Sequence, residues 1–364
     1  MEPEIRRSEL ENELLRRLDT GRRVILLAGP RGSGKTTLLH ELRTRRSLPR
    51  TALVQLELIT ASPEILCDRF LKLAGNALRP VMPGPCSYTR LLACVSRGHP
   101  GATLLLDEIT ELRTLSYFPG VRRPLGSFLE ALCRRGAPQC LATSRFPFWL
   151  RSHLRELPET VQARTDFLPL PPLTAQELQA EGVGEAAILT AATGGLPISI
   201  GPLLSRLETG QSLTEALAQE LEVGGRLEAE CRATLGELLH RARGYGACKA
   251  SLHVLSDEEG LTLSEIARRL QRKAGSTRDY LRWLEEVELI AVRRKRFYFV
   301  DPVLRLWLRL YGKGSLPSSR EIHKEVESHL EERNPEDHPI VPAPTSPSLR
   351  ATEISGEDEL IEID

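Results

Sequence analysis

Residues 29–36 read GPRGSGKT and match the pattern G-x-x-x-x-G-K-[ST] at all four constrained positions. The apolar run before them, residues 24–28, predicts a buried parallel strand, and residues 36–42 after them predict a helix. A glycine-rich turn between a strand and a helix presents backbone N–H groups to an anion, and the helix dipole adds to the attraction. The pattern therefore predicts a polyphosphate site.

Each residue type in this loop has a chemical reason. Glycines let the backbone approach the anion closely, Lys35 would contact the β- and γ-phosphates, and the Thr36 hydroxyl would ligate a magnesium ion. A structural turn without a ligand is the alternative, but such a turn has no need for Lys35 followed by Thr36. We therefore expect ATP and Mg²⁺ to be bound by the loop and the start of its helix, namely Gly29, Pro30, Arg31, Gly32, Ser33, Gly34, Lys35, Thr36 and Thr37.

A second apolar strand, residues 103–108, ends in two acids, about seventy residues beyond the loop. A carboxylate at the end of a neighbouring strand can hold the magnesium through water, and the next acid can orient and deprotonate an attacking water. This predicts Asp107 as the metal-holding acid and Glu108 as the catalytic base. An acidic turn that merely ends a strand is the alternative.

A further strand, residues 139–145, ends in polar side chains. In this position Thr143 or Ser144 would sense the γ-phosphate, and Arg145 would neutralise the charge that develops on it. An ordinary turn at the end of a strand is the alternative. Arg6 and Arg7 would lie either beside the nucleotide base or at the solvated start of a helix. Arg134 and Arg135 would either reach the site of a neighbouring subunit as arginine fingers or lie at a solvated helix end.

Composition limits the remaining possibilities. The 364 residues are 41% hydrophobic and 27% charged, with 49 basic and 49 acidic side chains, so any contact with nucleic acid must come from a local basic patch. The seven cysteines are scattered without a C-x-x-C pair, which predicts neither a disulfide framework nor a zinc site. The N-terminus does not resemble a signal peptide, and no run approaches the roughly 20 apolar residues of a membrane span. We expect a soluble, cytoplasmic protein that does not contact membranes.

The loop, the LLLDE segment at 104–108 and the ATSR segment at 142–145 together resemble the ATPase core of the archaeal-type AAA+ and STAND families, relatives of the origin-recognition initiator ATPases. Residues 167–177 are similar to the linker by which those proteins enter a helical lid. Residues 193–197 resemble the Gly-Leu-Pro motif of that lid. The resemblance implies an α/β P-loop NTPase of the ASCE/AAA+ type with a parallel-sheet core, in which Pro197 packs on the adenine.

Residues 252–255, 263–270 and 276–286 predict three helices, and residues 289–300 predict a β-hairpin with a basic tip. This order is typical of a winged helix-turn-helix, and residues 298–307 resemble the segment that closes this domain in the archaeal-type ATPases. Contact with double-stranded DNA would place four residues in or near the major groove and four on the wing: Ser276, Thr277, Arg278 and Arg282, then Arg293, Arg294, Lys295 and Arg296. A protein-docking or autoinhibitory module with a solvated wing is the alternative.

We therefore expect an ATPase core at 1–170, a helical lid at 171–230, a winged helix at 231–312, and a linker with a disordered acidic and proline-rich tail at 313–364. Within the tail, residues 320–333 would form one charged helix, and the acidic end of the tail would either dock on a partner or only solubilise the chain.

Two functions fit these parts. One is a DNA-associated ATPase; the other is a slow ATP/ADP switch that recruits a protein partner, and either protein would be able to form a homo-oligomer. A third alternative, a nucleotide-binding protein without hydrolysis, is disfavoured by the Asp107–Glu108 pair.

Overall fold

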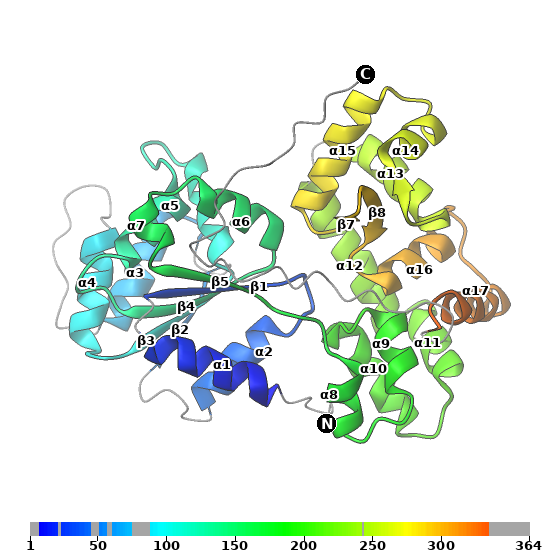
Figure 1. The fold of residues 1–364 in the computed structure, drawn as a ribbon, viewed down its shortest axis with the longest axis horizontal. Coiled ribbons are helices and arrows are strands. Elements are labelled where there is room, and N and C mark those ends of the chain that lie inside the picture. Colours follow the sequence, from blue (N-terminus) through cyan, green and yellow to red (C-terminus); the bar gives the residue numbers. More distant parts are fainter. Residues whose placement is uncertain are drawn as a thin grey trace.

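A parallel five-stranded sheet forms the centre of the N-terminal half (Figure 1). The computed structural model describes residues 7–20, 23–44, 51–56, 60–74, 88–241 and 244–334. The strand order is β2-β3-β4-β1-β5, and every neighbouring pair is parallel. The predicted parallel core is confirmed; its strands are β1 (Val24–Ala28), β2 (Thr51–Gln55), β3 (Thr103–Asp107), β4 (Gln139–Ser144) and β5 (Thr165–Pro169).

Helices cover both faces of this sheet, which explains why β1 and β3 are buried at every position. Alternate residues of β1 enter different cores. Val24 and Leu26 join the core under α3, α4 and α5, whereas Ile25 and Leu27 pack against α1 and α2. These helices are α1 (Ser8–Asp19), α2 (Lys35–Thr44), α3 (Pro63–Leu73), α4 (Tyr88–Gly98) and α5 (Pro124–Leu132).

The strand order decides which loops meet. Strand β4 lies between β1 and β3, so the carboxyl ends of these three strands share one edge of the sheet. The chain leaves that edge into α2 after β1, into the 3₁₀ helix η3 (Ile109–Tyr117) after β3, and into α6 (Pro147–Arg155) after β4. The short helix α7 (Glu159–Gln162) then leads to β5.

A second half, made mainly of helices, follows β5 (Figure 1). Its first four helices occupy the predicted lid: α8 (Ala175–Ala180), α9 (Ala186–Thr193), α10 (Pro197–Leu207) and α11 (Leu213–Leu221). The next helix, α12 (Arg226–Arg241), was not predicted. It spans the expected boundary at 230/231, and one continuous core joins it to the elements on both sides.

The predicted three helices and hairpin are present in the predicted order. A short strand precedes the second helix, and the sheet is antiparallel with the order β6-β8-β7. A two-residue turn, Arg294 and Lys295, joins the last two strands. The elements are α13 (Tyr245–Asp257), β6 (Leu261–Thr262), α14 (Leu263–Arg269), α15 (Ala274–Glu286), β7 (Ile290–Arg293), β8 (Arg296–Phe299) and the closing helix α16 (Pro302–Tyr311).

The charged helix predicted at residues 320–333 is confirmed as α17 (Ser319–Glu332). Ser318 caps the helix with Glu321, and Ile322 and Val326 are buried against the preceding helices. The apolar positions 322, 326 and 330 form one stripe that covers α11 and α16. Residues 335–364, with the predicted acidic end, lie outside the described residues.

The sequence predicted no disulfide framework, and Cys67 is disulfide-bonded. The other five described cysteines are free and buried. None of the helices that the structure describes is both long and apolar enough to cross a membrane.

Candidate nucleotide site

The loop after β1 has the backbone of a phosphate cradle. Gly32 and Gly34 lie in the left-handed region, with φ of 74° and 89°, which other residues rarely adopt. The Gly29 N–H donates to the Ser144 carbonyl at 3.0 Å and so fixes the loop to the end of β4. Helix α2 begins at Lys35, which places its N-terminal dipole at the end of the loop.

Lys35 is buried and folded against the loop. Its Nζ donates to the carbonyl oxygens of Gly29 and Pro30, each at 2.9 Å, and to the Ser33 Oγ at 3.3 Å. Burial lowers its pKa from 10.5 to about 8, and the nearby Glu108 and Asp107 oppose this change. The ammonium is therefore held within the loop by three neutral oxygen atoms. A bound phosphate would add a negatively charged partner.

This pKa predicts a pH-dependent affinity for ATP. Lys35 is charged below pH 8 in the free protein, so affinity should be constant there and should fall as the pH rises through about 8. The fall should be up to about tenfold per pH unit, because binding must then supply a proton. Titrations with ATP from about pH 7 to pH 10 measure it. Lys35→Arg stays charged and should give a flat profile; a flat profile for the wild type would contradict the prediction.

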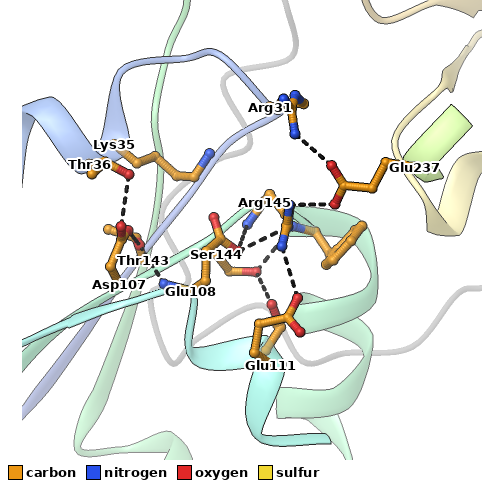
Figure 2. A network of polar contacts seen from close by, with 12 residues as sticks. Arg31, Lys35, Thr36, Asp107, Glu108, Glu111, Thr143, Ser144, Arg145 and Glu237 are labelled. Atoms are coloured by element: carbon orange, nitrogen blue, oxygen red, sulfur yellow. Dashed lines mark hydrogen bonds and ion pairs between the residues drawn. The ribbon is translucent and has the colours of Figure 1, made fainter. Parts of the chain in front are cut away.

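The predicted metal-holding residues meet at the sheet edge (Figure 2). The Thr36 Oγ1 donates to Asp107 Oδ2 at 2.9 Å, and the Thr143 Oγ1 donates to Asp107 Oδ1 at 2.6 Å. Mg²⁺ prefers oxygen ligands and usually takes only one or two from the protein, with phosphates and waters as the rest. Thr36 and Asp107 therefore suit a magnesium ion beside the phosphates.

Glu108 has a constrained position directly after β3. Its backbone is left-handed, with φ of 59°, and its N–H donates to the Thr143 Oγ1 at 3.0 Å. Its side chain accepts a hydrogen bond from the Arg145 backbone N–H at 3.0 Å. Burial raises the pKa of Glu108, against the lowering effect of Lys35 and Arg145. A carboxylate with a raised pKa is a stronger base, which suits the predicted role.

Both hydroxyls at the end of β4 are fully buried and bonded within the protein. Thr143 orients Asp107 and Glu108 through its Oγ1. The Ser144 Oγ accepts from the Phe146 N–H at 3.1 Å and contacts Thr110 at 3.3 Å. In this structure the two residues therefore position the acids and the turn into α6, and their predicted contact with a γ-phosphate stays a prediction.

Arg145 is the centre of an ion-pair network (Figure 2). Its guanidinium pairs with Glu111 at 3.0 Å, with Glu237 at 2.7 Å and with Glu108 at 3.5 Å. Arg31, in the phosphate loop, pairs with the same Glu237 at 2.6 Å. Arg31 and Arg145 are thus joined through one carboxylate of α12.

Helix α10, in the predicted lid, also contacts the loop directly. The Ile198 N–H donates to the Gly32 carbonyl at 3.2 Å, and the Ile198 side chain occupies the space that a Cβ at position 32 would need. Pro197 is the first residue of α10, and its Cγ lies 3.6 Å from the Cβ position of Gly34. Pro197 therefore lies against the loop, where the resemblance places it beside the nucleotide. Thr37 is exposed on α2.

Of the other arginines, Arg7 is neither solvated nor free to contact a base. It donates to the Pro171 carbonyl and pairs with Glu177 of α8 at 3.7 Å, so it fixes the start of α1 to the segment that follows β5. Arg6 lies outside the described residues. Arg134 and Arg135 follow the end of α5, instead of closing it, and are exposed.

The residues predicted to contact DNA are only partly on one surface. Thr277 is fully buried and donates to the Lys273 carbonyl, so its predicted contact is wrong: α15 turns this position toward the core. Ser276 is half-buried and also donates to Lys273. The exposed members are Arg278, Arg282, Arg294, Lys295 and Arg296, while Arg293 is partly buried beside Tyr298.

The fold can be compared with known structures. No protein-family model and no curated protein matches the sequence. A Walker-type ATPase of Pyrococcus abyssi superposes with a TM-score of 0.61 and 16% identity, over 85% of this chain and 99% of that one. The chain has an AAA+ ATPase fold. The ORC2 protein of Aeropyrum pernix, in ADPNP–ADP complexes, gives a TM-score of 0.51 and 15% identity, over 91% and 96% of the two chains.

Within this AAA+ fold the sequence missed two acids of the site, Glu111 and Glu237. Glu111 comes three residues after the predicted base, in a segment whose 3₁₀ conformation the pattern did not reveal. Glu237 lies 92 residues from Arg145 and 206 from Arg31 along the chain. Apolar residues at 227, 231 and 238 could have indicated helix α12, but no local signal predicts that it reaches the phosphate loop.

Proposed function

We propose that this protein binds ATP with Mg²⁺ and hydrolyses it slowly, and that the bound nucleotide sets the position of the C-terminal half. The observation that carries the proposal is the meeting of the phosphate loop, the Thr36–Asp107 pair and Glu108 at one edge of the sheet. Lys35, Asp107 and Glu108 are all buried, and burial of charged groups costs free energy. A turn with a purely structural role would have no need for these three charges.

The residues divide the reaction among them. The loop N–H groups and Lys35 hold the β- and γ-phosphates, and Thr36 with Asp107 holds the magnesium ion, which supplies charge neutralisation to the phosphates when bound. Glu108 orients a water in line with the γ-phosphate and takes its proton. Arg145, once directed toward the γ-phosphate, would stabilise the charge that develops there.

Measurement of ATP binding and of phosphate release by the purified protein tests this function. Binding with slow release supports it, and binding without any release would favour the nucleotide-binding protein that does not hydrolyse. Stimulation of release by higher protein concentration would support a homo-oligomer, in which Arg134 and Arg135 are the exposed arginines to replace first.

A second proposal concerns the winged helix as a binding surface for double-stranded DNA. The observation that favours it is the turn of the hairpin. Arg294 and Lys295 both have positive φ, 50° and 64°, in a two-residue turn where glycine and asparagine are the favoured residues. Two long basic side chains are thus kept at the tip despite conformational strain, and Arg278 and Arg282 are exposed on α15.

Replacement of Arg293, Arg294, Lys295 and Arg296 with alanine should weaken DNA binding similarly for all sequences. It should also flatten the dependence of log affinity on log salt by about 0.9 for each DNA phosphate that the variant no longer neutralises. ATP hydrolysis without DNA should survive, because none of these four residues belongs to the predicted nucleotide site. Electrophoretic shift or anisotropy titrations at several salt concentrations measure the slope.

The double variant Arg134→Ala/Arg135→Ala, which removes exposed charge from the core, is the control and should leave the slope unchanged. A quadruple variant with the wild-type slope would remove the hairpin from the DNA-binding surface. If the wild type does not bind DNA, the alternative is favoured: a slow ATP/ADP switch that recruits a protein partner through this module or the C-terminal segment.

A further inference from the structure

One carboxylate from the C-terminal half joins two arginines of the nucleotide site. Glu237 lies on α12 and extends toward the core, where its Oε2 accepts from Arg31 at 2.6 Å and its Oε1 from Arg145 at 2.7 Å (Figure 2). Both are charge-assisted hydrogen bonds, which are stronger than neutral ones. The contact therefore fixes α12 to the core at the phosphate loop.

Both arginines lie beside the proposed binding site of the triphosphate. Arg31 is a variable position of the loop itself, between Pro30 and Gly32. Arg145 follows β4 and contacts Glu108, the predicted base, through its backbone N–H and its guanidinium. Arg145 is only 6% exposed, so its charge is balanced by the carboxylates around it and is not directed at solvent.

A second acid of the C-terminal half reaches the same region. Glu288, in the turn between α15 and β7, accepts from the Phe148 N–H at 2.8 Å, at the start of α6. Its backbone is left-handed, with φ of 60°, and it lines a cavity together with Arg31 and Glu230 of α12. The C-terminal half therefore meets the edge of the nucleotide site with carboxyl groups at more than one point.

We propose that Glu237 is a positioning residue that competes with the γ-phosphate for Arg31 and Arg145, so that ATP weakens the contact between α12 and the core more than ADP does. This inference rests on the proposed binding of ATP at the phosphate loop. A γ-phosphate carries more charge than a carboxylate and offers three acceptor oxygens to the same guanidinium groups. When it takes them, Glu237 loses its bonds to these two arginines and faces a like charge.

Replacement Glu237→Gln tests the competition, because the amide keeps the size of the side chain and removes its charge. Affinities for ADP and for a non-hydrolysable ATP analogue, both with Mg²⁺, are measured by titration calorimetry. The analogue should bind about tenfold more tightly than to the wild type, which corresponds to about 1.4 kcal/mol, and ADP should change by less than about twofold.

Glu230→Gln is the matched control. Glu230 lies on the same helix and, among the described residues, pairs with Arg31 at 3.5 Å but not with Arg145, so its removal should change the preference for the analogue over ADP much less. An equal change for both nucleotides in Glu237→Gln, or weaker binding of the analogue, would overturn the inference. A purely structural role of Glu237 would leave the preference between the two nucleotides as it is in the wild type.

If Glu237→Gln does not fold, the protein with Glu237 intact provides the test. Fluorescent labels at the exposed positions Arg134 of the core and Arg294 of the hairpin report the distance between the halves. The ATP analogue should change energy transfer between them, and ADP should change it less; the same response to both would reject the inference. Failure of the wild type to bind either nucleotide would instead reject the proposed function.

Discussion

Replacement of Lys35 with alanine is expected to abolish or greatly weaken the binding of ATP. Lys35 is the main positive charge at the loop, and its Nζ is held by Gly29, Pro30 and Ser33 where the β- and γ-phosphates would arrive. Truncation of one partner of a buried, hydrogen-bonded charge pair typically costs about 2–5 kcal/mol, which predicts a loss of at least about thirtyfold. Calorimetric titration with ATP and Mg²⁺ measures it.

The interpretation requires that the variant folds, which circular dichroism and thermal melting establish. Lys35→Arg is the companion variant: it keeps the charge, but its rigid planar fork does not fit the two carbonyls in the same way, so we expect an intermediate affinity. An unchanged affinity of folded Lys35→Ala for ATP would show that this loop is not the phosphate site.

The second large effect is expected from Glu108→Gln. The amide oxygen can still accept from the Arg145 N–H, so the loop after β3 should keep its shape, and ATP with Mg²⁺ should remain bound. The amide is a very poor base, however, and loss of a positioned base usually slows a reaction by about a hundredfold or more. The rate of phosphate release under saturating ATP measures this loss.

Glu111→Gln is the matched control for this experiment. Glu111 is a buried acid of the same segment and also pairs with Arg145, but it is not at the end of β3 beside Asp107 and Lys35. We expect a smaller loss of turnover from it. Wild-type turnover in Glu108→Gln would assign the base to another residue, and equal losses in the two variants would point to Arg145 as the group that both of them disturb.

The nucleotide site shows which structural features contiguous residues are sufficient to predict. The loop, its strand and its helix are contiguous, so glycine spacing and the Lys35–Thr36 pair specify both structure and chemistry. The strand ends at Asp107 and at Ser144 were predictable because continuous apolar runs indicate strands covered on both faces. The same local signals predicted the three helices and the hairpin between residues 252 and 300, but they did not predict α12 or β6.

It was harder to predict which positions of a helix are buried. The pattern of residues 276–286 indicated a helix, and Thr277 was assigned to the DNA side because the last helix of a winged helix-turn-helix enters the major groove. The packing of α15 on α13 and α14 turns this position inward, and the hydroxyl is satisfied by the Lys273 carbonyl. Similarly, α17 is charged along most of its length, yet a stripe of three apolar residues suffices to bury it on α11 and α16.

The sequence by itself determined the parallel core and the phosphate loop, and it predicted that Thr36 and Asp107 lie at one magnesium ion. These follow from short-range spacing and from the rule that carboxyl ends of parallel strands share one edge. Only the tertiary structure placed Glu237 between Arg31 and Arg145 and Glu288 against α6. Those contacts join segments 92 to 206 residues apart, and a charged side chain on a helix surface carries no local sign of the partner that packing will bring to it.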